Sequence, residues 1–232
     1  MRKVGWVLAL LAVAVLSAWG QKVKPLLDED GVYLSSKGVS AAKLVHSVPA
    51  VALEDPRLEG LKHICALNVV IGADGIPAAM EIVNKVTTPF DNAAKAAVRQ
   101  SQFEPGSFEG KPVPTRLMVW VPFLGKGHPA LPVAGSAKDL KDLKSPVPIF
   151  TPDAEFSEAA RFLHKGGVVL VRILVTEEGL PTRERVLVHA EHGLDEKALE
   201  AVKKYRFRPA FLEGVPVPVM MSIEVNFRLP PF

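Results

Sequence analysis

Cysteine and histidine are the first residues in this sequence whose types and spacing could do chemistry. Cys65 lies two residues after His63, and a thiolate beside an imidazole can act as a nucleophilic pair. In a strand, residues at i and i+2 lie on the same face, but no third group in the sequence orients this imidazole. The sequence therefore favours Cys65 as a buried strand residue over Cys65 as a nucleophile.

A second group, His189, Glu191 and His192, has the side chains of a metal site but no further ligand in sequence. In the basic cluster, Lys203 and Lys204 lie in the last turn of a predicted helix, where cations suit the helix dipole, and Arg206 and Arg208 lie in the extended segment that follows. No phosphate-binding loop, zinc signature or hydrolase nucleophile motif occurs. We therefore expect no enzyme, and no catalytic, metal or cofactor residue.

The composition is that of a folded protein, because 48% of the 232 residues are hydrophobic and 23% are charged. A net charge of +3 is too small to indicate a nucleic-acid partner. Cys65 is the single cysteine, so no internal disulfide is possible.

The N-terminal residues predict an export signal. Arg2 and Lys3 precede an uncharged run over residues 4–20, which ends in Ala18-Trp19-Gly20. Ala18 and Gly20, the small residues three before and one before a cut after Gly20, fit a cleaved signal peptide, and the alternative is a single uncleaved membrane anchor. We expect the periplasm in the first case and, in the second, the inner membrane with the chain facing the periplasm. Residues 21–47 form an N-terminal segment.

One pattern occurs twice. Residues 103–114 are FEPGSFEGKPVP and residues 207–218 are FRPAFLEGVPVP, and a shift of 104 positions keeps further matches in register between residues 66 and 124. Chance alone would not keep these matches at one constant shift, with no insertion, over the whole span. The sequence therefore predicts a tandem duplication.

The second copy shows the elements most clearly. Runs at 167–176 and 181–189 flank a Glu-Glu-Gly turn and predict a β-hairpin. Residues 194–205 have helical spacing, residues 217–229 alternate as a strand, and an earlier helix begins with Asp153 as a possible N-cap.

These elements predict an α+β protein made of two α-β-β-α-β modules, each a small antiparallel sheet packed against helices. The modules cover residues 48–124 and 148–232. Residues 125–147 between them are rich in Pro, Gly, Ser and Lys and predict a linker.

The second copy resembles the C-terminal domain of the TonB family over nearly all of residues 148–229. The resemblance rests on the hairpin, the helix and the segment that leads into the last strand. Its motif residues are Tyr205, Phe207, Pro209, Gly214 and Pro216. The first copy departs from the family, with Ser101 at the position of Tyr205 and His63 at that of Gly167, and is degenerate.

The resemblance implies a partner and a mechanism. TonB C-terminal domains bind the Ton box, a short peptide of an outer-membrane transporter, as an added strand on a sheet edge. The candidate edge residues in the last strand are Val217, Val219, Met221, Ile223, Val225 and Phe227. In the first copy Pro122 replaces Asn226 and removes an amide N–H.

Met118 and Trp120 of the first copy stand where the second has Ser222 and Glu224. An apolar face at this place predicts a docking surface for the second module or for a partner. The alternative is that another segment, such as residues 22–47, covers these side chains.

Two classes of function stay open: a TonB-like peptide-binding protein linked to transmembrane transport, and an adaptor whose twin domains pair with each other or form a homodimer. Coupling to the ExbB/ExbD motor, which the family achieves through a His in its membrane helix, is not supported, because residues 4–20 contain no His. The discriminating feature is whether the strand at 217–229 has a free edge.

Overall fold

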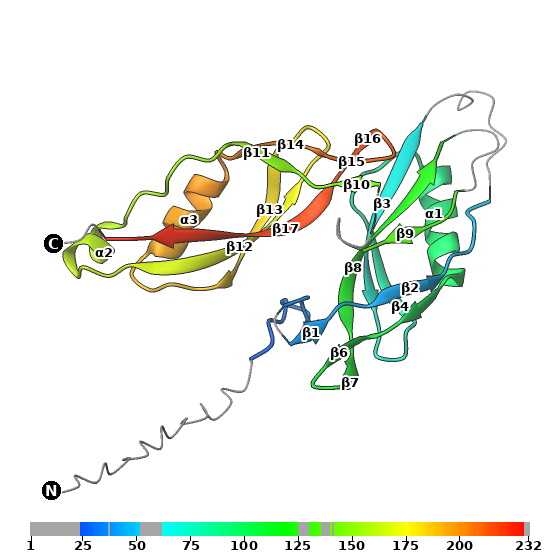
Figure 1. The fold of residues 1–232 in the computed structure, drawn as a ribbon, viewed down its shortest axis with the longest axis horizontal. Helices are drawn as coiled ribbons and strands as arrows, with labels where there is room; N and C mark the ends of the chain where they lie inside the picture. The colour runs from blue at the N-terminus through cyan, green and yellow to red at the C-terminus, as the bar shows by residue number, and fades with distance from the viewer. Residues whose placement is uncertain are drawn as a thin grey trace, which may run out of the picture.

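The computed structural model describes residues 24–36, 38–51, 62–124, 130–135, 140 and 142–229. They form two α+β modules side by side, with β1 of the N-terminal segment between them (Figure 1). No helix in this described part is long and apolar enough to span a membrane. The predicted signal peptide or anchor at residues 1–20 lies outside the described residues.

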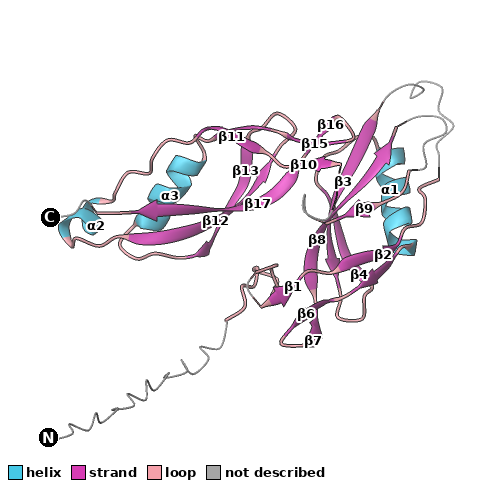
Figure 2. Cartoon of the chain, viewed as in Figure 1, coloured by secondary structure: helices cyan, strands magenta, loops and turns pink. Residues whose placement is uncertain are grey.

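The first module has one main sheet, in the order β4-β3-β8-β9, with a helix on one face (Figure 2). Two small antiparallel sheets, β1-β6-β7 and β2-β5, complete it. The bounds are β1 (Val39–Ser40), β2 (Lys43–His46), β3 (His63–Ile71), β4 (Pro77–Ile82), α1 (Thr88–Gln100), β5 (Gln102–Glu104), β6 (Gly106–Phe108), β7 (Lys111–Val113), β8 (Thr115–Phe123) and β9 (Val133–Ala134).

The second module repeats this plan with the main sheet β13-β12-β17 and the small sheets β10-β15-β16 and β11-β14. The bounds are β10 (Leu143–Lys144), β11 (Val147–Phe150), α2 (Glu158–Phe162), β12 (Gly167–Val175), β13 (Pro181–Val188), α3 (Leu194–Val202), β14 (Arg206–Arg208), β15 (Ala210–Leu212), β16 (Val215–Val217) and β17 (Val219–Phe227).

The two modules keep the same strand register. β3 pairs with β8 from His63 opposite Phe123, and β12 pairs with β17 from Gly167 opposite Phe227, a shift of 104 on both strands. The small sheets follow the same shift, since β1 pairs with β6 as β10 pairs with β15. Parts of the expected N-terminal segment and linker thus supply strands to the two modules.

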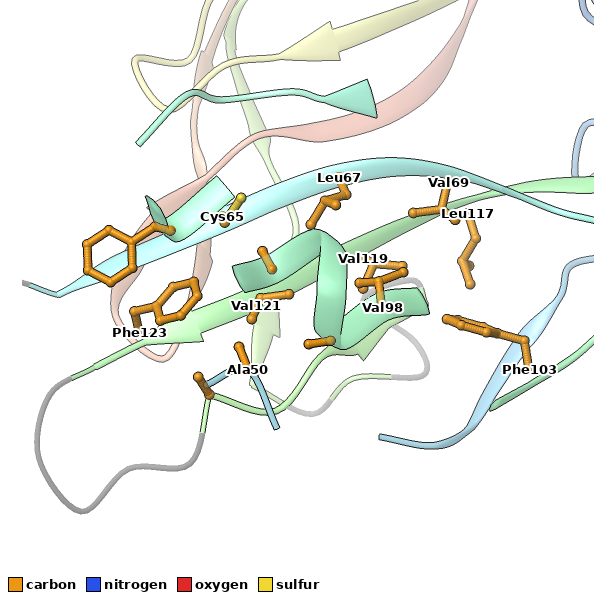
Figure 3. Close-up of a cluster of buried hydrophobic side chains, with 14 of the residues drawn as sticks. Ala50, Cys65, Leu67, Val69, Val98, Phe103, Leu117, Val119, Val121 and Phe123 are labelled. Atoms are coloured by element: carbon orange, nitrogen blue, oxygen red, sulfur yellow. The ribbon is translucent and has the colours of Figure 1, made fainter. Parts of the chain in front are cut away.

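Each module has its own core between the sheet and its helix. In the first, alternate residues of β3 and β8 pack against α1, and the rings of Phe90 and Phe123 are 4.6 Å apart (Figure 3). In the second, Val169, Val171 and Ile173 of β12 pack against α3 in the same way. Burying one such side chain contributes about 1.5–3 kcal/mol, so these clusters stabilise the modules individually.

The repeated motif forms a hairpin and docks it on the module. Glu213 and Gly214 turn the chain between β15 and β16 with φ of 51° and 80°, the left-handed pair of a tight hairpin turn. Upstream, the N–H of Phe207 donates to the carbonyl of Gly179 at 2.9 Å. A Cβ on Gly179 would lie 1.8 Å from the Phe207 carbonyl oxygen, so only glycine permits this approach.

Three predicted boundaries differ from the structure. Ser157, not Asp153, is the N-cap of α2, because its Oγ accepts a hydrogen bond from the N–H of Ala160 at 3.0 Å. The predicted helix at 194–205 ends at Val202. The strand predicted at 217–229 is interrupted at Pro218, which separates β16 from β17. The matching first helix of the first copy falls at residues 52–61, outside the described residues.

Candidate partner-binding edge

β17 is an edge strand of the second main sheet. It pairs with β12 along its whole length, from Val219 opposite Val175 to Phe227 opposite Gly167. No other strand in the described part of the chain pairs with β17. A row of backbone N–H and C=O groups therefore faces away from the sheet, as an extended partner strand requires.

The first repeat indicates which backbone groups face outward. Pro122 in β8 has no N–H, yet it lies within a continuous ladder with β3, opposite Ile64. Because backbone groups alternate in direction along an antiparallel strand, residue 122 must face away from β3. By the repeat, Asn226 faces away from β12. The carbonyl of Pro218, in the same alternate row, accepts from Trp120 Nε1 of the other module at 3.1 Å, which agrees with this direction.

Four of the six residues named from the sequence lie on the inner side of this strand. Val225 and Phe227 are buried in the module core, while Met221 and Ile223 pack against it. Val217 is buried and Val219 partly buried in a separate cluster between the modules. The outward backbone groups belong instead to Met220, Ser222, Glu224 and Asn226.

The hydropathy pattern does not identify the four residues with outward backbone groups, because it reports the polarity of side chains and not the direction of backbone N–H and C=O groups. Pro122 of the first copy identifies these residues, because its missing N–H shows that residue 122 faces away from β3.

The equivalent edge of the first repeat is covered. β9 pairs with β8 through Val119 opposite Ala134 and Trp120 opposite Val133. Further along, the N–H of Tyr33 donates to the carbonyl of Pro114 at 3.0 Å. The chain itself therefore occupies the edge of β8 that corresponds to the free edge of β17.

The motif residues are structural neighbours of the edge and do not line it. Tyr205 and Phe207 are buried with ring centroids 6.3 Å apart, and burial, with a smaller effect of Asp153, raises the pKa of Tyr205. Gly214 lies in the β15–β16 turn, and Pro216 pairs opposite Phe211. Pro209 is half-buried between β14 and β15. These residues hold the hairpin that leads into β17.

Met118 and Trp120 lie on the face of the first sheet that turns away from α1. Trp120 is 1% exposed and belongs to an apolar cluster that includes Leu143, Leu212 and Val217 from the second repeat. No described residue of 24–46 is part of this cluster. Outside the cluster, Arg183 and Glu81 form an ion pair of 2.7 Å between the modules.

Cys65 and His63, which could have formed a nucleophilic pair, each contact another residue. Cys65 is buried and its Sγ lies 3.7 Å from Asp91 Oδ1; burial and then Asp91 raise the pKa of the thiol to about 12. The ring of His63 is 6.0 Å from that of Phe90. A thiol with this pKa is protonated at neutral pH, so Cys65 has the character of a core residue.

The histidines of the second copy make local pairs. His189 Nδ1 lies 2.6 Å from Asp195 Oδ2, and His192 Nε2 lies 3.6 Å from Glu191 Oε2. Among the described residues no three His, Cys, Asp or Glu side chains are grouped as metal ligands would be. In the basic cluster, Arg206 Nη1 donates to the carbonyl of Tyr205 at 2.7 Å and binds the chain at the end of α3.

Comparison with known proteins gives matches in both repeats. The model of the family described as "Gram-negative bacterial TonB protein C-terminal" matches residues 56–123 and 152–229. "Protein TonB" of Vibrio cholerae serotype O1 (strain ATCC 39315 / El Tor Inaba N16961) is 34% identical over 64 residues, or 27% of this chain and 26% of that protein. The chain thus matches about a quarter of that relative's length.

Among solved structures, the solution NMR structure of the Pseudomonas aeruginosa TonB CTD aligns with a TM-score of 0.33 and 22% sequence identity. The alignment covers 39% of this chain and 90% of that chain.

Proposed function

Since the chain belongs to the family of Gram-negative bacterial TonB C-terminal domains, we propose that it is a cell-envelope protein linked to TonB-dependent transport. Its second repeat binds a short, extended peptide of an outer-membrane transporter. The peptide adds as a strand to the free edge of β17 and pairs with the outward backbone groups of residues 220–226.

The observation that carries this proposal is the difference between the two edges. β17 has an unpaired edge in the described structure, whereas β9 pairs with the corresponding edge of β8. A strand with one unpaired edge is what β-strand addition needs. The polar outer face of β17, with exposed Ser222, Glu224 and Asn226, leaves room for the side chains of an added strand.

The first test is a titration of the full chain with Ton-box peptides, followed by backbone NMR and amide hydrogen exchange. We expect shifts along β17 and slower exchange at the amides of Met220, Ser222, Glu224 and Asn226. No such change is expected along β8, because its edge is already paired. Shifts elsewhere, with β17 unchanged, would refute the proposal.

A matched pair of variants isolates the backbone contribution. Asn226→Pro removes one outward N–H, while Asn226→Ala removes only the side chain. One hydrogen bond contributes about 0.5–1.5 kcal/mol, so Asn226→Pro should weaken peptide binding about 2- to 13-fold relative to Asn226→Ala. Equal affinities for the two variants would exclude strand addition at this end of β17.

A specific observation favours a second candidate function, an adaptor whose two modules pair with each other. The apolar cluster around Trp120 joins the outer face of the first sheet to the hairpin of the second module. In this case Trp120→Ala would separate the modules, and the full chain would show no peptide-dependent change along β17. Peptide binding that persists in Trp120→Ala would instead favour the first candidate.

A further inference from the structure

A cavity of about 1010 Å³ lies between the two modules. Its walls come from the outer faces of both main sheets and from residues 34–36 and 40–44 of the N-terminal segment. Small-molecule sites in proteins commonly have volumes of about 300–1,000 Å³, so the cavity is large enough for an organic ligand. It shares Met220 and Ser222 with the edge of β17 proposed for a peptide, but the faces of the two sheets form most of it.

Apolar side chains from both repeats line the cavity. Met118 and Trp120 come from the first sheet, and Leu170, Leu187 and Met220 come from the second. Two thioethers and an indole adapt well to a flexible hydrocarbon body. This lining therefore suits a ligand whose larger part is apolar.

Unpaired polar atoms occur on the same walls. In the described part of the chain, two buried side-chain oxygens have no hydrogen-bond partner, Ser36 Oγ and Asn68 Oδ1. Both residues line this cavity, and Asn68 is only 9% exposed. An amide oxygen accepts and cannot donate, so Asn68 requires an O–H or N–H donor from whatever fills the space.

One of the two guanidinium groups on the cavity wall also has no direct partner within the described part of the chain. Arg116 is paired with Asp28 and Asp30 at 2.7 and 2.8 Å. Arg172, on the facing sheet, forms no ion pair among the described residues. Burial and then the charge of Arg116 lower the pKa of Arg172, although Asp28 acts in the opposite direction. An anion beside Arg172 would offset both the burial of the guanidinium charge and its repulsion by Arg116.

We propose that the intermodule cavity binds an amphipathic organic anion that carries a hydroxyl group. The anionic group pairs with Arg172, the hydroxyl donates to Asn68 Oδ1, and the hydrocarbon body lies against Trp120, Met118 and Leu170. The two repeats together make this site, since each contributes one wall.

Calorimetric titration of the full chain with 3-hydroxydodecanoate tests the proposal. The matched ligands are dodecanoate, which lacks the hydroxyl, and methyl 3-hydroxydodecanoate, which lacks the charge. We expect 3-hydroxydodecanoate to bind more tightly than either. No binding of the hydroxy acid, or equal binding of the methyl ester, would overturn the proposal and would leave water as the content of the cavity.

Variants assign the roles of the two polar residues. Arg172→Leu should weaken 3-hydroxydodecanoate binding by at least about tenfold, as loss of a charge-assisted pair requires. Arg161→Leu, at an exposed position on α2 away from the cavity, should leave it unchanged. Asn68→Leu should abolish the preference for the hydroxy acid over dodecanoate and leave dodecanoate binding in place. If both ligands bind Arg172→Leu as tightly as wild type, the site is not the one proposed.

Ser222→Trp gives a test that does not depend on removing a charge. The larger side chain fills the cavity from β17 and should block 3-hydroxydodecanoate while circular dichroism stays unchanged. Asn226→Pro, which acts on the backbone edge and lies outside the cavity, should retain ligand binding. Retained ligand binding together with weakened peptide binding in Asn226→Pro would separate this site from the proposed peptide edge. Unimpaired ligand binding by Ser222→Trp would contradict the proposal.

Discussion

The last strands of the two repeats, β8 and β17, share a register and differ in what surrounds them. β8 is buried along nearly its whole length, with α1 against one face, the second module against part of the other and β9 along its edge. β17 is buried only on its inner face and carries exposed Ser222, Glu224 and Asn226 on the outer one. The inner cores of the two repeats are alike. The repeats therefore differ at the surfaces where a partner would bind, and not in the interior that determines the fold.

The largest expected effect comes from removing the apolar side chain that marks this difference. Trp120→Ala should lower the free energy of unfolding by about 3–5 kcal/mol, because it empties a buried site and leaves the Pro218 carbonyl without its donor. Chemical denaturation of the full chain measures the change. The matched position in the other repeat, Glu224→Ala, is exposed and should change stability by no more than about 0.5 kcal/mol. Similar losses for the two variants would invalidate the comparison.

The second prediction tests the backbone direction along β17. Val225→Pro removes an N–H that faces β12 and should lower the free energy of unfolding by at least about 1–3 kcal/mol, since a buried carbonyl loses its partner. Asn226→Pro should cost much less, because its N–H faces outward and the first repeat already has Pro122 at this position. Denaturation of both variants measures the difference. The reverse order of stability would show that the outward row is the other set of residues.

The smallest expected effect is a pH dependence confined to the first repeat. The pKa of Cys65 is raised from about 9 to about 12, so the folded thiol keeps its proton where the unfolded thiol loses it. This contribution to stability is complete below pH 9 and is lost progressively between pH 9 and pH 12. At pH 10 the loss is about 1 kcal/mol.

Cys65→Val, which places the residue of the second repeat at this position, should remove that part of the pH dependence. Denaturation between pH 8 and pH 10.5 gives the stability of both proteins, and their difference cancels the titration of tyrosine and lysine. A parallel decline in the two proteins would mean that the thiol is not held in its protonated form by the fold.

Much of the fold was predictable because its signals are local. The β-branched run at 167–176, the extended run at 181–189, a glycine at the hairpin tip and a helical period from Leu194 each need only neighbouring residues to be interpreted. The TonB family resemblance and the α+β class are confirmed by the family match and the observed elements. The N-cap of α2 was misassigned to Asp153, because the true cap, Ser157, is recognised by its bond to Ala160 and not by residue type alone.

The candidate site was less predictable, because the direction of a backbone group and the occupancy of an edge are not properties of side chains. The apolar residues named for β17 are the inward set, and Pro122 of the other repeat was needed to identify the outward set. Nothing in the sequence of Val133 and Ala134 indicates that they pair with β8, since a two-residue strand has no periodicity.

The sequence by itself determined the motif that recurs 104 positions apart, the hairpin, helix and last strand of the second copy, and the apolar character of Met118 and Trp120, because each of these depends on residue type and spacing. Only the tertiary structure decided that Trp120 lies against the second module, that β9 covers one edge while β17 keeps another free, and that Arg172 and Asn68 face a common cavity. The position of Trp120 and the shared cavity depend on residues some 100 positions apart, and the pairing of β9 with β8 depends on residues some 15 positions apart. Burial and hydrogen bonding establish such contacts only as the chain folds.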